Sequence, residues 1–226
     1  MSVIYLPANK PEDWQPLLGD PLKHWRTGYS AKTLAYCWQE ANGFPREVKT
    51  VFLNAGKPFD TLIPLIILPE HKVSLPGRST ASQSDLWILA KSGRVLFSIT
   101  VEGKVSESFN KPVSEWLLKD TKGKQDRLEF LIKTLGISDN FDRSIRYQLL
   151  HRTASAILEA ERFLASHAMM IVHSFSSSDK WFEDYAKFLG LFGLIPEINS
   201  VVSAKTPLGL HLHFAWIHGD EEYLKK

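Results

Sequence analysis

Hydrophobic residues recur at helical spacing in some segments of the chain and form short uninterrupted runs in others. The first clear helical pattern spans residues 31–41, where Leu34 and Trp38 lie one turn apart. Ser30 can cap the start of this segment, and Gly43 follows its end. We therefore expect a helix over residues 31–41.

Short apolar runs rich in β-branched residues predict strands. Four such runs span residues 48–54, 62–68, 85–90 and 95–101. Pro69 and a loop rich in Gly and Ser separate the second run from the third, whereas Ser92 and Gly93 between the last two are typical of a hairpin turn. The last two runs are therefore expected to pair as an antiparallel hairpin.

The rest of the chain is expected to alternate helices with strands. The spacing of apolar residues predicts helices over residues 113–118, 125–135, 144–166 and 181–191. Apolar runs predict strands over residues 168–175 and 209–217. The chain has no internal repeat, and its loops are too short to separate two cores, so we expect a single α/β domain over residues 1–226.

Composition narrows the class of protein without naming a partner. The 226 residues are 44% hydrophobic, enough for a sizeable core, and 27 basic against 25 acidic side chains give a formal charge of +2. This balance excludes a strongly basic nucleic-acid-binding protein. Cys37 is the only cysteine, so an internal disulfide cannot form. With no visible export signal or membrane span, we expect a cytoplasmic protein without a membrane partner.

The predicted hairpin carries the residues that point to chemistry. Glu102 and Lys104 are two apart on one strand and therefore share a face. Asp85 opens the partner strand, and antiparallel pairing brings it beside the end where Glu102 lies. Two converging carboxylates repel unless a cation lies between them, and oxygen ligands favour Mg²⁺ or Mn²⁺. The sequence therefore predicts a divalent cation at this sheet edge.

Such an ion suits the hydrolysis of a phosphodiester. It can polarise a phosphoryl oxygen and lower the pKa of an attacking water. Lys104 could orient that water or neutralise the charge that develops on the phosphate. Gly103 has no side chain, which leaves its carbonyl within reach of the metal.

The segments SQSD, ending at Asp85, and VEGK, ending at Lys104, resemble the PD-(D/E)xK, or restriction-endonuclease-like, superfamily, with a Ser in place of the usual Pro before Asp85. The resemblance implies an α-β-β-β-α-β core, a mixed central sheet flanked by helices, over about residues 31–175, followed by a C-terminal α/β extension over about 176–226. It also implies that Asp85, Glu102 and Gly103 bind the metal and that Lys104 assists catalysis.

The same resemblance implies a substrate and further site residues. Gln148 and Arg152 lie one turn apart on the helix after the hairpin, where the superfamily often places residues that face the site. The implied activity is that of a Mg²⁺- or Mn²⁺-dependent nuclease acting on DNA or, second, RNA. Symmetric cleavage of a duplex would require a homodimer. The alternative is a catalytically inactive binding or assembly module on the same scaffold.

Several of these residues also have plainer interpretations. Glu102 and Lys104 could form only a solvated ion pair. Glu40 and Glu70 could add a carboxylate to the site, although surface positions are the expectation for both. His211 and His213 share a strand face and could bind zinc, but no third ligand has a suitable spacing, so a polar strand face is the expectation.

Aromatic and basic residues leave a further choice open. The seven Trp residues could stack on bases, although most are expected in the core. A basic segment could contact phosphates or remain a solvated loop; it contains Lys119, Lys122, Lys124 and Arg127.

Overall fold

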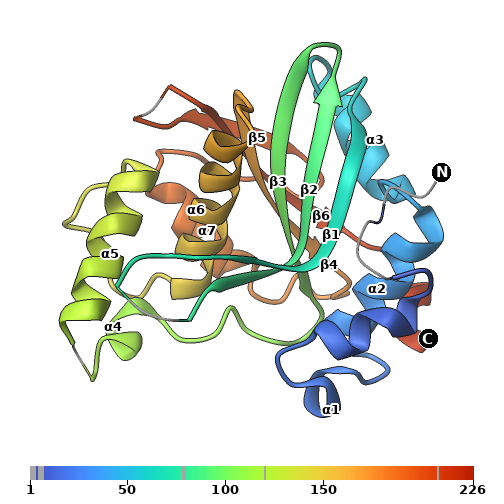
Figure 1. Cartoon of the computed structure of the whole chain (residues 1–226), viewed down its shortest axis with the longest axis horizontal. Helices are drawn as coiled ribbons and strands as arrows, with labels where there is room; N and C mark the ends of the chain where they lie inside the picture. Colours follow the sequence, from blue (N-terminus) through green and yellow to red (C-terminus); the bar gives the residue numbers. More distant parts are fainter. Residues whose placement is uncertain (1–3, 5–7, 78–79, 120, 208) are drawn as a thin grey trace.

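A six-stranded sheet separates two layers of helices in the computed structural model, which describes residues 4, 8–77, 80–119, 121–207 and 209–226 (Figure 1). The strands are β1 (Ile63–Val73), β2 (Ser82–Ser92), β3 (Val95–Lys104), β4 (His167–Ser174), β5 (Val201–Lys205) and β6 (His211–His218). The expected α/β class, with a mixed sheet flanked by helices, is confirmed.

The helices vary widely in length. The α-helices are α1 (Pro21–His24), α2 (Ser30–Ala41), α3 (Arg46–Ala55), α4 (Val113–Trp116), α5 (Lys122–Leu135), α6 (Tyr147–Arg162) and α7 (Phe182–Gly190). Two 3-10 helices are η1 (Pro11–Leu17) and η2 (Glu221–Lys225). Among the helices that the structure describes, none combines the length and apolar character needed to cross a membrane.

The sheet has the strand order β1-β2-β3-β4-β6-β5. β2 runs antiparallel to both β1 and β3, whereas β3, β4 and β6 are parallel and β5 is antiparallel to β6. The predicted hairpin is confirmed, because Leu86 pairs with Val101 and Ser92 with Val95 across the turn. Long crossovers through the helices make the parallel pairs possible.

One face of the sheet packs against α2, α3 and the N-terminal residues. Trp38 and Phe52 from these helices meet Ile99 of β3 in a continuous buried cluster. Trp14 of η1 is also buried, and its indole nitrogen donates to Gln39 Oε1 at 2.9 Å. That contact ties the N-terminal segment to α2, as expected for a buried Trp.

The other face packs against α5, α6 and α7. Leu149 and Ala156 of α6 contribute to a second buried cluster with Met170 of β4 and Phe214 of β6. Figure 1 shows α6 lying along this face, beside the central strands. Every strand from β2 to β6 is thus covered on at least one face by helices, which explains the apolar character of the central strands.

The prediction of a strand over residues 48–54 is wrong, because this segment lies within α3. Val48, Val51 and Phe52 are the buried residues of α3, at the spacing of one helical face. Pro45 precedes the helix and Gly56 ends it. Packing of this face against the sheet outweighs the strand propensity of the β-branched residues.

Several element limits also differ from the expectation. β1 continues through Pro69 to Val73, and β2 starts three residues before Asp85, so both strands extend into the predicted loop. β5 was not expected at all. β5 and β6 lie in the same sheet as the hairpin, so the C-terminal segment completes the sheet.

A backbone contact between Gly77 and Gly123 fixes the loop after β1 against α5. A Cβ on Gly123 would lie 2.0 Å from the carbonyl oxygen of Gly77, which no real contact allows. We therefore expect Gly123→Ala to lower the free energy of unfolding by about 1–3 kcal/mol in urea denaturation. Gly190→Ala is the control, since its Cβ meets nothing within 4 Å and we expect no loss of stability there. Equal effects of the two changes would contradict the importance of this contact.

Candidate active site

Three carboxylates lie in a row across β1, β2 and β3. Leu86 pairs with Val101, so Asp85 and Glu102 occupy the next position of that ladder. On the other side of β2, Glu70 falls opposite Asp85, between the pairs Pro69–Leu86 and His71–Ser84. Antiparallel register therefore places the three acids at neighbouring positions of the sheet.

Glu102 is buried and held by two cations. Lys104 Nζ donates to Glu102 Oε1 at 2.6 Å, and Arg152 Nε donates to Oε2 at 2.7 Å. Gln148 Nε2 adds a third hydrogen bond to Oε1 at 2.7 Å. Glu102 and Lys104 are only 3% and 4% exposed, so this is a buried network and the interpretation as a solvated ion pair is wrong.

α6 supplies two members of this network. Gln148 and Arg152 lie one turn apart on the helix, and their side chains reach the same carboxylate of β3. Arg152 is 8% exposed. The structure thus brings together the residues that the sequence analysis selected on β3 and α6.

Asp85 lies beside the same network but has different partners. Its Oδ2 accepts a hydrogen bond from the backbone nitrogen of Gly103 at 2.8 Å. A Cβ on Gly103 would lie 3.4 Å from this Asp85 oxygen and 3.3 Å from Leu34 Cδ2 of α2. The absence of a side chain at Gly103 therefore leaves room for both neighbours.

Glu70 belongs to this group, although the sequence analysis expected a surface position. It is half-buried and accepts a hydrogen bond from Gln83 Nε2 at 2.7 Å. Its backbone has a φ of 53°, in the left-handed region that residues other than Gly rarely adopt. The continuation of β1 beyond Pro69 is what carries Glu70 into the site. Glu40, the other candidate, is exposed as expected.

The carboxylates differ in their electrostatic environments. Burial and the nearby charge of Glu102 raise the pKa of Asp85 to about 7. Burial and the charge of Asp85 likewise raise the pKa of Glu70 well above its ordinary value. Burial also acts on Glu102, but Lys104 and Arg152 outweigh it and lower the pKa. Arg152 acts in the opposite direction on both Asp85 and Glu70, but among the described ion pairs neither acid has a direct cationic partner.

The network opens into a cavity of about 700 Å³. The sheet and α6 form its floor with Glu70, Asp85, Glu102, Lys104, Gln148 and Arg152. The N-terminal segment forms one wall with Leu18, Gly19, Asp20, Lys23, His24 and Tyr29. Volumes of this order are typical of ligand sites.

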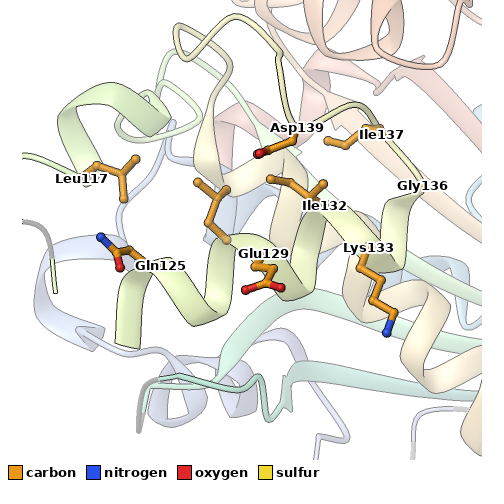
Figure 2. A pocket seen from close by; sticks show the side chains of 9 residues that line it. Leu117, Gln125, Glu129, Ile132, Lys133, Gly136, Ile137 and Asp139 are labelled. Atoms are coloured by element: carbon orange, nitrogen blue, oxygen red, sulfur yellow. The ribbon is translucent and has the colours of Figure 1, made fainter. Parts of the chain in front are cut away.

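Another hollow of similar size, about 690 Å³, lies along α5 and has a different character. Figure 2 shows Ile132, Ile137 and Leu117 around it, together with the separated charges of Glu129 and Lys133. These polar groups do not converge on a common point in the view. We therefore take the cavity at the row of carboxylates as the candidate active site.

The alternative interpretation of His211 and His213 as zinc ligands is not supported by the arrangement of their rings. Their rings are parallel within 2°, with centroids 6.3 Å apart. His213 Nε2 instead lies 2.7 Å from His167 Nδ1, and its Nδ1 lies 2.7 Å from Ser203 Oγ. Both nitrogens of His213 are therefore engaged in hydrogen bonds.

Cys37, Glu47 and His173 form a second group of potential ligands, with ligand atoms all within 4.8 Å of one another. The indole nitrogen of Trp38 donates to His173 Nδ1 at 3.0 Å. Since an indole nitrogen is only a donor, His173 Nδ1 must accept and Nε2 must carry the hydrogen that faces Glu47. This tautomer fits a hydrogen-bonded chain better than a metal site.

Comparison with known proteins identifies a family to which no activity is assigned. A family model described as a domain of unknown function (DUF6946) matches residues 7–221. No curated protein and no solved structure matches the chain.

The raised pKa of Asp85 predicts a pH-dependent stability in the absence of divalent ions. Between about pH 4 and pH 7 the folded protein keeps a proton that the unfolded chain releases, so this group's contribution to stability falls as the pH rises. We expect Asp85→Asn to raise the free energy of unfolding at pH 8 by roughly 1–3 kcal/mol and to have little effect at pH 4. Urea denaturation in the presence of a chelator, at pH 8 and at pH 4, measures the free energy of unfolding of both proteins.

Asp139→Asn serves as the control for this experiment, because the Asp139 side chain is 85% exposed. We expect it to leave the pH dependence unchanged. A loss of stability in Asp85→Asn at pH 8 would contradict the electrostatic strain assigned to Asp85.

The pairing of Arg152 with Glu102 predicts a large effect from removing one partner. Arg152→Met leaves a buried carboxylate with one cation fewer, so we expect a loss of about 3–5 kcal/mol in the free energy of unfolding. Adding Glu102→Gln should recover much of this loss, as a double-mutant cycle would show. Arg162→Met on the same helix is the control, since that side chain is 67% exposed. Additive effects at Arg152 and Glu102 would contradict the coupling.

Proposed function

Because the chain belongs to the DUF6946 family, which carries no assigned activity, its function must come from its own site, and we propose that it is a Mg²⁺- or Mn²⁺-dependent nuclease. The proposed substrate is DNA or, second, RNA. The proposed scaffold is a divergent restriction-endonuclease-like core. Hydrolysis of a phosphodiester bond is the proposed reaction.

One observation carries this proposal. Asp85, Glu102 and Lys104 line one cavity together with Gln148 and Arg152, although they come from two strands and a helix. A cavity that gathers acids, a lysine and an arginine suits phosphoryl transfer, where catalysis depends on positioning and charge stabilisation.

The order of elements supports the same scaffold. α2 precedes β1, β2 and β3, and α6 and β4 follow. This order, with the three intervening helices α3, α4 and α5 set aside, matches the α-β-β-β-α-β order of the superfamily. The acid near the start of β2 and the E-x-K end of β3 occupy the corresponding places.

The charges of the site fit a divalent cation. Three carboxylates, at Glu70, Asp85 and Glu102, face two permanent cations, at Lys104 and Arg152. Asp85 and Glu102 would hold the ion with the carbonyl of Gly103, and Glu70 would add a further acidic side chain beside them. When bound, the ion supplies Lewis acidity toward a phosphoryl oxygen and lowers the pKa of water.

The protein's own residues would complete the reaction. Lys104 donates to Glu102 and Gln148, so its ammonium group is held at the floor of the cavity, where it can neutralise charge on a phosphate. Arg152 keeps Glu102 ionised, which maintains an oxygen donor set. Gln148 positions both Glu102 and Lys104.

A second candidate is a binding or assembly module without catalysis. Its supporting observation is that both carboxylate oxygens of Glu102 already accept hydrogen bonds, from Lys104, Gln148 and Arg152. A metal ion at Glu102 must compete with these donors. Such a module would keep the fold and bind no ion with appreciable affinity.

Cleavage and metal titration together separate these candidates. For the nuclease we expect Mg²⁺- or Mn²⁺-dependent cleavage of labelled DNA or RNA, reduced at least a hundredfold in Asp85→Ala and Glu102→Gln. Calorimetry should show saturable Mn²⁺ binding that Glu102→Gln weakens. Glu115→Gln is the control, because the Glu115 side chain is 44% exposed and pairs only with Lys111 among the described ion pairs.

Cleavage that persists unchanged in Asp85→Ala would identify a contaminating nuclease and refute the proposed site. Absence of both cleavage and Mn²⁺ heat would favour the inactive module.

A further inference from the structure

A smaller hollow adjoins the proposed active site. It has a volume of about 190 Å³ and is lined by Trp116, Tyr147 and His151. Asn110 lines both this hollow and the larger cavity. The hollow lies between the end of α4 and the start of α6, directly next to the network around Glu102.

The two hollows are also joined through α6 and β2. Arg152 Nη1, in the larger cavity, lies 3.4 Å from Ser82 Oγ, which lines the smaller one. Ser82 Oγ is in turn 2.8 Å from His151 Nδ1. Arg152, Ser82 and His151 therefore form a hydrogen-bonded connection between the two hollows.

The smaller hollow offers aromatic surface with a cation at its side. The Trp116 and Tyr147 rings stack with centroids 4.0 Å apart and planes within 10°, and His151 lies 4.8 Å from Tyr147. Lys124 Nζ lies 5.5 Å from the centroid of Trp116. Lys124 Nζ also donates to the carbonyl oxygen of Trp116. Because the two half-buried rings cover each other's inner faces, a base would stack against the outer side of this pair, as bases stack on aromatic side chains in proteins that bind single-stranded nucleic acid.

The dimensions favour a single strand over a duplex. The N-terminal segment walls the larger cavity, with Leu18, Lys23 and Tyr29 on that side. A space of about 190 Å³ accommodates one nucleobase and excludes a base pair. A base within a duplex would have to unpair and leave its stack before it could enter the smaller hollow. This step has a free-energy cost that is smaller for a base in a single strand.

The small number of basic side chains in the larger cavity also favours a single strand over a duplex. The larger cavity is lined by five carboxylates, at Asp20, Glu70, Asp85, Glu102 and Glu107, against three lysine or arginine side chains, at Lys23, Lys104 and Arg152. Binding along a duplex draws on many phosphate contacts with cations. Three lysine or arginine side chains supply few such contacts, so affinity would have to come from a bound divalent ion and from stacking.

We propose that the site accepts single-stranded nucleic acid, with the phosphodiester to be cleaved in the acidic cavity and a neighbouring base in the hollow formed by Trp116, Tyr147 and His151. This inference rests on the proposed nuclease function and adds the form of its substrate. It also gives a role to Trp116 and Lys124, which the sequence alone left undecided between a structural and a nucleic-acid-binding role.

Binding measured separately from cleavage tests the proposal. Fluorescence anisotropy with Ca²⁺ in place of Mg²⁺ would compare a labelled single-stranded DNA, the matching RNA and a blunt duplex of the same length. We expect a single strand to bind at least about tenfold more tightly than the duplex. The DNA and RNA arms identify which sugar is preferred, and preference for either single strand supports the proposal.

A matched pair of variants locates the base. Trp116→Leu should weaken single-strand binding about fivefold or more, as the loss of one stacking platform does, while leaving Mn²⁺ binding in calorimetry unchanged. Phe130→Leu on α5 is the control, since Phe130 is a half-buried aromatic residue that lines neither hollow. If Trp116→Leu does not fold, Lys124→Gln against the exposed Lys133→Gln gives the same comparison.

The possible failures are distinguishable. Duplex binding as tight as single-strand binding, or equal effects of Trp116→Leu and Phe130→Leu, would overturn this inference while metal-dependent cleavage still supported the nuclease. Absence of any binding, together with absence of cleavage and of Mn²⁺ heat, would overturn both.

Discussion

The buried carboxylate of Glu102 can exist only with its cationic partners, and the arrangement of the site follows from that requirement. An unpaired charge at this depth would be strongly destabilising, whereas Lys104 from the same strand and Arg152 from α6 surround it. These contacts fix how far along the sheet α6 can lie. They also place Gln148, one turn from Arg152 on the same helix, against the other oxygen of this carboxylate. The ion pairs of Glu102 with Lys104 and Arg152 therefore fix the position of α6 on the sheet and also line the cavity.

Residues whose placement depends on local rules could be predicted from the sequence. A two-residue period puts Glu102 and Lys104 on one face, and a hairpin turn at Gly93 brings Asp85 to the same end. A spacing of four on a helix puts Gln148 and Arg152 together. The fold class followed from similar short-range patterns.

Residues whose placement depends on tertiary pairing could not be predicted. Pro69 was taken to end β1, yet β1 is an edge strand and tolerates a residue that donates no hydrogen bond. Glu70 consequently enters the site from a position that looked like a loop. In the same way, α3 has a composition typical of a strand, and only the packing of its buried residues against the sheet makes it a helix. β5 is a short, partly exposed edge strand with a weak apolar signal.

Leu34 of α2 lies close to Gly103, at the point where the buried cluster under α2 meets the candidate site. Leu34 belongs to the cluster under α2, while the nitrogen of Gly103 orients Asp85. A shift of α2 would therefore reach the peptide whose nitrogen holds the carboxylate of Asp85. Substitutions in the core-facing side of α2, which contributes none of the proposed ligands, would in that case change the position of Asp85 while leaving the charges of the cavity as they are.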